Sequence, residues 1–364
     1  MSRVSPVVYL LLLLAVTASS IWHVLGKVAL SHGMDAGVFL VYRLVLTSMV
    51  LLLGGRFVFR IGFVPVESRL EGRLVLIGVS TFLHSVFFLY GLQLTTPFMC
   101  AIMQPAVPVL VWLMSVVSGS EKANVRKALG VILCSLGAVG AASLSTHHAE
   151  AVSAREGTNF KIGIGLLVLQ CIFYAIHLVF QQPLLQALPP VQVTGMVYGI
   201  AGLTMLTATV LQTLLTKILV PLVAPSKIGQ FPSPLWSLSA DNTAWLALGF
   251  CVLFASAFTH GIYSWATKKV AATTVSVFIT VEPLTTTLVS LAITRSGLPG
   301  VGEMVCAGVL AIGVMLVLLG GPTQVRREDY EVIPKATEEF DLEDEPEKST
   351  RKRGSEDGVT LHRM

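Results

Sequence analysis

A single carboxylate, Glu282, lies deep inside the apolar segment 272–293 and directly precedes Pro283. A charge at the centre of a bilayer costs about 2.5–3.5 kcal/mol on insertion scales, so an ionisable residue there needs a partner or a purpose. Pro283 has no N–H to donate to the carbonyl of Ile279, which leaves an acceptor close to the carboxyl group. Glu282 is therefore a candidate proton carrier or ligand for a cationic group. The alternative is a neutral glutamate that braces the kink.

An arginine, Arg43, is expected in the outer half of another apolar segment, 37–54, where it follows Val41-Tyr42. A guanidinium group can bind a carboxylate through two parallel hydrogen bonds, which suits a substrate carrying an acid group. It can also extend toward lipid headgroups and contact carbonyls at a neighbouring helix end. Both interpretations of Arg43 remain open from the residues alone.

Four histidines also fall inside apolar segments, namely His23, His84, His177 and His260. They can hydrogen-bond across helices, line a cavity or relay protons. Two facing histidines can also hold a haem, but they must then lie at matched depth in the membrane. A haem-bearing or other membrane enzyme is therefore kept as an alternative, whereas the primary expectation is that the protein is not an enzyme, with no cofactor and no metal site.

The segment 97–118 contains Gln104, Pro105 and Pro108. The prolines remove the helical hydrogen bonds to the carbonyls of Ala101 and Gln104, so we expect both carbonyls to be left free. Broken helices near the midplane are where many transporters bind substrate. The predicted kink or gating residues are Pro105, Pro108 and Pro283, and the candidate substrate-binding or coupling residues are Glu282, Arg43, Gln104, Trp22, His23, His84, His260 and Tyr263.

The elements that position these residues are predicted to be membrane-spanning helices. The chain is 54% hydrophobic and only 13% charged, with a mean hydropathy of +0.76, which is too apolar for a soluble domain. A spanning helix needs about 20 apolar residues. Ten segments meet this need, at about 7–30, 37–54, 74–93, 97–118, 127–145, 162–181, 192–217, 244–266, 272–293 and 301–320.

The two halves of the chain repeat one pattern. Ile21-Trp22-His23 recurs as Ala175-Ile176-His177, Val41-Tyr42-Arg43 recurs as Val197-Tyr198-Gly199, and Pro108 recurs as Pro283. Five helices in each half leave the halves oppositely oriented. The sequence therefore predicts an all-α membrane protein of two inverted five-helix repeats, with the substrate between them. The residues most expected to recognise the substrate lie where the two halves differ. These positions are Arg43, which matches Gly199, and Glu282, which matches Val107.

The predicted organisation has four parts, and basic residues orient it. The parts are a first repeat at 1–145, an outer linker at 146–161, a second repeat at 162–320 with a long outer loop at about 219–243, and a disordered tail at 321–364. Lys and Arg are more numerous in the loops on the side of the N-terminus, which predicts that both termini are cytoplasmic. The net charge of +4 reflects this bias and indicates no nucleic-acid partner.

Several other classes of protein are disfavoured. The five cysteines lie inside apolar segments without CxxC spacing, which disfavours disulfides and structural zinc. No GxxxxGK[ST] motif is present, so an ATP-driven pump is excluded. Gly130 and Gly137 in the fifth segment recur as Cys306 and Gly313 in the tenth, and such small residues predict close helix packing or a homodimer surface.

Several short motifs resemble the EamA fold of the drug/metabolite transporter superfamily, and among its members the plant nodulin-type, Walls-Are-Thin-like exporters. These motifs are Gly26-Lys27-Val28-Ala29-Leu30, Gly33-Met34, Tyr42-Arg43, Tyr90-Gly91-Leu92, Thr95-Thr96, Pro108 and Pro283-Leu284. The chain departs from that branch at His84-Ser85, where a Gln-Asn pair is usual, and at Pro105, where an Asn is usual. The resemblance implies a multi-pass transporter of the plasma membrane, with a vacuolar or other endomembrane second, but a relative's substrate is not carried over.

The predicted function is secondary transport or facilitated movement of a small organic metabolite, such as an amino acid or organic acid, by alternating access and with proton coupling as an option. The partners are then the substrate and the lipid bilayer. The enzyme remains one alternative. A transporter-derived receptor or scaffold that signals through the charged tail is another.

Overall fold

Helices and their short connections make up the described chain, and no strand occurs in it. The computed structural model describes residues 6–95, 97–144, 158–223, 241–282, 284–286, 288 and 301–320. The chain divides into the units Met1–Glu331 and Val332–Met364, and every described residue belongs to the first. The all-helical class expected from the sequence is confirmed over these residues. The predicted tail from residue 321 and residues 224–240 of the predicted outer loop lie outside them.

The first half contains six helices and a short π-helical extension. They are α1 (Pro6–Ser31), α2 (Ala36–Leu53), η1 (Gly54–Val58), α3 (Ser68–Leu94), α4 (Pro97–Met103), α5 (Ala106–Val117) and α6 (Val125–Leu144). The second half contains α8 (Thr158–Phe180), α9 (Gln182–Ala187), α10 (Pro190–Val223), α11 (Asn242–Phe250), the π-helix η3 (Cys251–Phe258), α12 (Thr259–Lys269), α13 (Ala272–Ile279) and α15 (Val301–Leu319). A helix therefore lies at each of the ten predicted segments.

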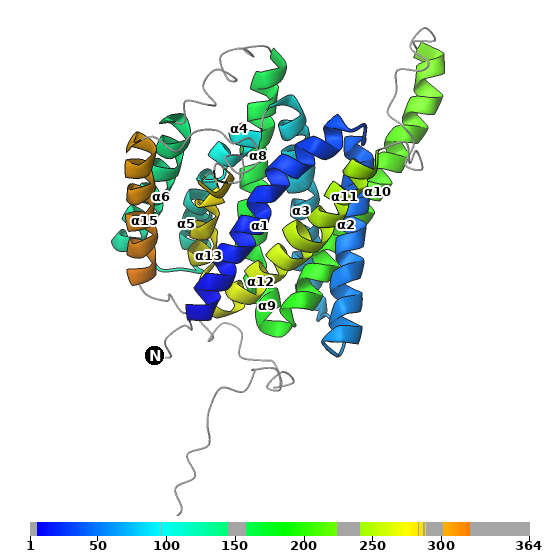
Figure 1. The fold of residues 1–364 in the computed structure, drawn as a ribbon. Coiled ribbons are helices and arrows are strands. Elements are labelled where there is room, and N and C mark those ends of the chain that lie inside the picture. The colour runs from blue at the N-terminus through cyan, green and yellow to red at the C-terminus, as the bar shows by residue number, and fades with distance from the viewer. Residues whose placement is uncertain are drawn as a thin grey trace, which may run out of the picture. The chain divides into compact units, whose positions relative to one another are not determined.

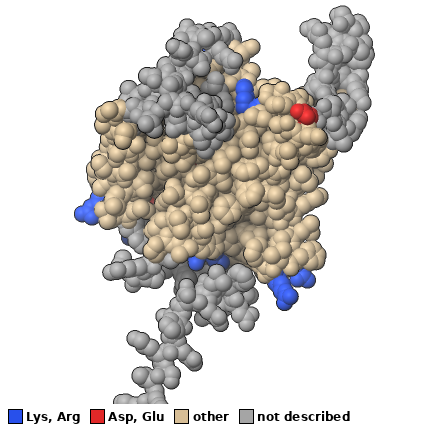
Figure 2. Space-filling view, viewed as in Figure 1, with Lys and Arg blue, Asp and Glu red and all other residues tan. Residues whose placement is uncertain are grey.

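Seven helical spans among the described residues are long and apolar enough to cross a bilayer, and α15 adds a shorter apolar helix, Met304–Leu319. A chain in hydrocarbon must satisfy its backbone polar groups internally, which helices do. On the face shown in Figure 2, the Lys, Arg, Asp and Glu side chains lie near the upper and lower edges, and the broad middle is almost free of them. The protein is thus an integral, multi-pass membrane protein.

Helices of the two halves pack against each other in a reciprocal way (Figure 1). The first apolar helix of the first half, α1, packs on the third of the second half, α11 with η3 and α12. The third of the first half, α3, packs on the first of the second, α8. Helix α2 also packs on α10, α5 on α13, and α6 on α15.

The fourth apolar segment of the first half is broken between α4 and α5. Contrary to expectation, the break does not free the carbonyls of Ala101 and Gln104: they accept hydrogen bonds from the N–H groups of Gln104 (3.2 Å) and Val107 (2.9 Å). These tighter turns take the place of the bonds that the prolines remove. The hydroxyl of Ser135 also donates to the carbonyl of Pro105 at 2.6 Å.

Glycines bring the backbones of α6 and α15 into contact. A Cβ atom placed on Gly137 would lie 2.5 Å from the nitrogen of Leu310, and one on Gly313 would lie 2.5 Å from the nitrogen of Cys134. Only a residue without a side chain allows this approach. The predicted small-residue surface is therefore used for packing between α6 and α15 within one chain.

Candidate functional site

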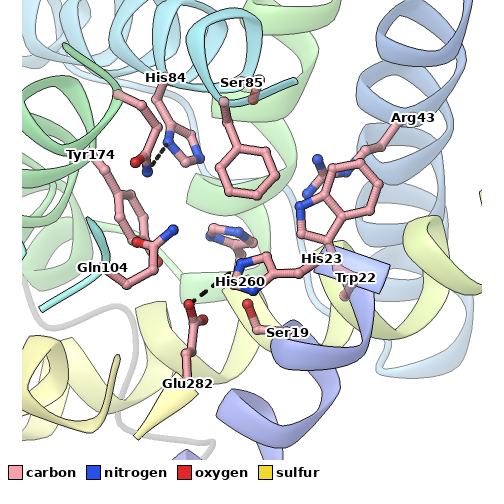
Figure 3. Close-up of a pocket in the computed structure, with 13 residues that line it drawn as sticks. Ser19, Trp22, His23, Arg43, His84, Ser85, Gln104, Tyr174, His260 and Glu282 are labelled. Carbon is pink, nitrogen blue, oxygen red and sulfur yellow. Dashed lines mark hydrogen bonds and ion pairs between the residues drawn. The ribbon is translucent and has the colours of Figure 1, made fainter. Parts of the chain in front are cut away.

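A cavity of about 30 Å³ lies between helices of both halves, lined almost entirely by polar and aromatic side chains (Figure 3). Its walls come from α1, α2, α3 and the connection between α4 and α5 in the first half, and from α8, η3, α12 and the residues after α13 in the second. Such a volume holds a few water molecules, whereas pockets for organic ligands measure ~300 Å³ or more. The lining residues are Ser19, Trp22, His23, Arg43, His84, Ser85, Phe88, Gln104, Gln170, Tyr174, Ala255, His260 and Glu282.

Glu282 faces His23 on one side of the cavity. The Oε2 atom of Glu282 lies 3.6 Å from Nε2 of His23, and the two side chains are 4% and 1% exposed. Figure 3 shows Ser19 beside the same carboxyl group. Neither Oε2 of Glu282 nor Nδ1 of His23 has a hydrogen-bond partner among the described residues. A buried carboxyl group with a free oxygen is suited to gain and lose a proton or to bind a donor from a solute.

The main chain around Glu282 is held by α1 and by the following turn. Helix α13 ends at Ile279, where the N–H of Thr280 turns back to the carbonyl of Val277 at 3.1 Å. The carbonyl of Glu282 accepts hydrogen bonds from Thr285 (3.0 Å) and from Ser20 of α1 (3.5 Å). The carboxyl group is therefore positioned at a helix break, as its place before a proline suggested. Pro283 itself lies outside the described residues.

Arg43 faces the cavity from α2 without a carboxylate partner. Its Cζ atom lies 4.1 Å from the centroid of the Trp22 ring, and its Nε donates to Oγ of Ser256 at 2.8 Å. The residue is 5% exposed, so it does not extend toward headgroups as one interpretation allowed. Among the residues that the structure describes, no Asp or Glu side chain pairs with it. The cavity therefore contains a guanidinium group that no described carboxylate contacts directly.

The remaining histidines pack around Tyr174 of α8. His84 stacks on Tyr174, with ring centroids 4.6 Å apart, and its Nδ1 lies 3.1 Å from Nε2 of Gln170. His260 meets Tyr174 edge-on at 6.1 Å and His177 at 6.3 Å. These contacts are the cross-helix hydrogen bonds and ring packing expected of intramembrane histidines. No group of three His, Cys, Asp or Glu in the described chain is arranged to hold a metal ion.

Seven of the eight candidate residues line the cavity, and Tyr263 does not. Tyr263 is 2% exposed and packs against His260, with ring centroids 5.8 Å apart, and its hydroxyl has no described partner. The amide oxygen of Gln104 is likewise without a described partner and belongs to the lining. Pro105 and Pro108 begin α5 directly after Gln104, so they set the position of that amide.

Several lining residues were not among the candidates: Ser19, Ser85, Phe88, Gln170, Tyr174 and Ala255. Three polar residues of α8 are spaced as one helical face, since Gln170, Tyr174 and His177 follow at intervals of four and three residues. That spacing was a usable signal for Gln170 and Tyr174. Ser85 adjoins the predicted His84. Phe88 and Ala255 are apolar residues in apolar helices, and no sequence pattern distinguishes them.

The fold and site define a class, a multi-helix membrane protein with a buried polar cavity between its halves. More narrowly, the chain belongs to the EamA-like transporter family, whose model matches residues 6–143 and 161–319. Membrane transport of small molecules follows from that membership.

Two relatives of Arabidopsis thaliana share 29% of residues with it. The match to Protein WALLS ARE THIN 1 covers 46% of this chain and half of that protein. The match to a WAT1-related protein covers 75% of this chain and 73% of that protein. A solved crystal structure with 16% identity aligns with a TM-score of 0.61, over 88% of this chain and 99% of the other, which shows the likeness of fold.

Proposed function

We propose that this protein is a secondary transporter that moves a small organic anion, such as an organic acid, together with a proton. The observation that carries the proposal is the buried Arg43, with which no described Asp or Glu side chain pairs, on the same cavity as Glu282. A guanidinium group in a water-poor site binds a carboxylate in two-point geometry. Trp22 lies flat against Arg43 and supports its orientation.

Charge balance links the anion to the proton. An uncompensated positive charge inside a membrane is costly, so the charge of Arg43 is best balanced by one negative charge nearby. In the empty cavity an ionised Glu282 supplies that charge. When an anion binds to Arg43, a second negative charge in the same cavity is unfavourable, and Glu282 takes up a proton. One proton then accompanies each monoanion, and the carrier crosses between its two states with a nearly neutral cavity.

We further propose that access alternates between two inverted five-helix repeats, residues 1–145 and 162–320. The reciprocal pairing of α1 with α11–α12 and of α3 with α8 supports a two-fold relationship. So do the helix breaks, which fall at Gln104–Pro105 in the first half and at Thr280–Val281 in the second. The cavity of about 30 Å³ is too small for an organic solute, which fits an occluded state that opens toward one side at a time.

The orientation and location belong to the same proposal. Both termini lie in the cytoplasm, as the excess of basic residues on that side predicts. The plasma membrane is the first location to test, with a vacuolar or other endomembrane second.

Flux into proteoliposomes tests the proposal. A panel of amino acids, organic acids, nucleobases and sugar phosphates is offered with and without an inward proton gradient. The proposal requires that solutes with an acid group enter, that their amide or ester analogues do not, and that a proton gradient drives uptake above equilibrium. Uptake of neutral analogues at the same rate, with no response to the gradient, would refute it.

A further inference from the structure

The segment between α2 and α3 carries exposed aromatic and basic side chains side by side. Phe57 is 74% exposed and Phe63 65%, and Arg56 and Arg60 are exposed beside them. The segment follows the end of α2 that lies at the lower edge of the bundle in Figure 1, and Figure 2 shows Lys and Arg side chains gathered along that edge. Residues 54–66 contain no acidic side chain.

This exposure is imposed by an ordered connection. Gln192 of α10 donates from Nε2 to the carbonyl of Val64 at 2.6 Å and accepts from its N–H at 3.1 Å. The N–H of Ile61 donates to the carbonyl of Gly55 at 2.9 Å, which closes the turn. Val64 also packs on the apolar cluster that contains Leu70. The chain is thus fixed on both sides of the exposed phenylalanines.

The backbone of Arg60 gives a second, independent observation. Its φ angle is 52°, and it is the one non-glycine residue of the described chain with a positive φ. This left-handed conformation is unfavourable for a residue with a Cβ atom and is normally taken by glycine. A glycine, Gly62, stands two residues away. An arginine in such a strained position points to a use for its charge.

We propose that residues 56–63 form a binding surface for the headgroups of anionic phospholipids in the adjacent leaflet. The exposed phenylalanine rings of the surface, at Phe57, Phe59 and Phe63, enter the boundary between headgroups and acyl chains, as apolar side chains of interfacial segments do. Arg56 and Arg60 bind the phosphate oxygens, for which guanidinium groups have matching geometry. This proposal is independent of the transported solute, because the surface shares no residue with the cavity.

Native mass spectrometry of the purified full-length protein tests the surface directly. The protein in neutral detergent is titrated with phosphatidylglycerol and, separately, with phosphatidylcholine. We expect the wild-type protein to retain phosphatidylglycerol in preference to phosphatidylcholine. The double variant Arg56→Gln/Arg60→Gln should bind phosphatidylglycerol more weakly than the wild type, by a factor on the order of ten. Arg69→Gln is the matched control, because Arg69 is exposed on the same side but already pairs with Glu67.

A second arm separates charge from packing and does not depend on a variant. Raising the salt concentration of the wild-type titration from about 0.1 M to about 1 M shortens the screening length severalfold, and the preference for phosphatidylglycerol should shrink. The variant Arg56→Lys/Arg60→Lys keeps the charge and should keep most of the preference. Equal retention of both lipids by the wild type, or an unchanged preference in the double glutamine variant, would overturn the proposal.

Discussion

Nε2 of His23, in the first half of the chain, lies 3.6 Å from Oε2 of Glu282, in the second half. His23 comes from α1, and Glu282 follows the break after α13. His23 also stacks on Phe88 of α3, with ring centroids 5.4 Å apart, so its ring has little freedom to turn away. The pair lines the same cavity as Arg43, for which the structure describes no carboxylate partner. This arrangement is the origin of the predictions below on transport.

Glu282→Gln should uncouple transport from the proton gradient. The amide cannot ionise, so the cavity stays in the charge state that favours a bound anion. Exchange of labelled for unlabelled anion across the membrane should persist, whereas net uptake driven by an inward proton gradient should be lost. Counterflow and gradient-driven uptake are measured in the same proteoliposomes. A variant that still responds to the gradient as the wild type does would exclude Glu282 as the coupling group.

Arg43→Gln should weaken anion binding strongly. A hydrogen bond to a charged group contributes about 1.5–3 kcal/mol, so the dissociation constant should rise roughly ten- to a hundredfold. The dissociation constant of Arg43→Lys should lie between those of the wild type and Arg43→Gln, because lysine keeps the charge but loses the contact of the guanidinium group with the Trp22 ring. Ser256→Ala removes the partner of Nε but keeps the guanidinium group, and it serves as the mild control. Ligand-induced thermal shifts give the affinities, and wild-type affinity in Arg43→Gln would remove Arg43 from the site.

Glu121 and Lys127 form a buried ion pair whose disruption should destabilise the fold. Their side chains are 1% and 0% exposed, 3.0 Å apart, and Glu121 also accepts from Oγ1 of Thr273 on α13 at 2.7 Å. Removing one partner leaves a buried charge, at a cost of about 3–5 kcal/mol. Glu121→Gln should therefore lower the free energy of unfolding more than Thr273→Val does. Unfolding in detergent, followed by circular dichroism, ranks the variants, and equal stabilities would contradict this.

Gly137→Val should separate α6 from α15. The added side chain would begin 2.5 Å from the backbone nitrogen of Leu310, a contact that the helices can relieve only by moving apart. We expect a clear loss of thermal stability or of folded protein. Gly308→Ala is the matched control on α15, because a Cβ at Gly308 meets nothing within 4 Å. Fluorescence-detected gel filtration after heating compares the two, and a stable Gly137→Val protein would show that this contact is dispensable.

Much of the fold was predictable because a continuous run of apolar residues marks each membrane helix in the sequence. The predicted segment 7–30 corresponds to α1 (Pro6–Ser31), and 37–54 to α2 (Ala36–Leu53). The free carbonyls expected at Ala101 and Gln104 were not predictable in detail, and the expectation was wrong. A proline always removes a backbone N–H donor. Whether the chain then forms a tighter turn, which supplies another donor to the same carbonyl, depends on the surrounding packing.

The sequence by itself determined the helices, the membrane class and the short list of polar residues that a bilayer would not tolerate without a reason. It could do so because a chain in hydrocarbon must close its backbone hydrogen bonds within each helix, which makes these properties local. Only the tertiary structure decided that Arg43 faces Trp22, that Glu282 faces His23, and that Tyr263 packs against His260 without lining the cavity. Those relationships depend on how each helix is rotated against its neighbours, and helices that are apolar on nearly every side carry little sequence signal for that rotation.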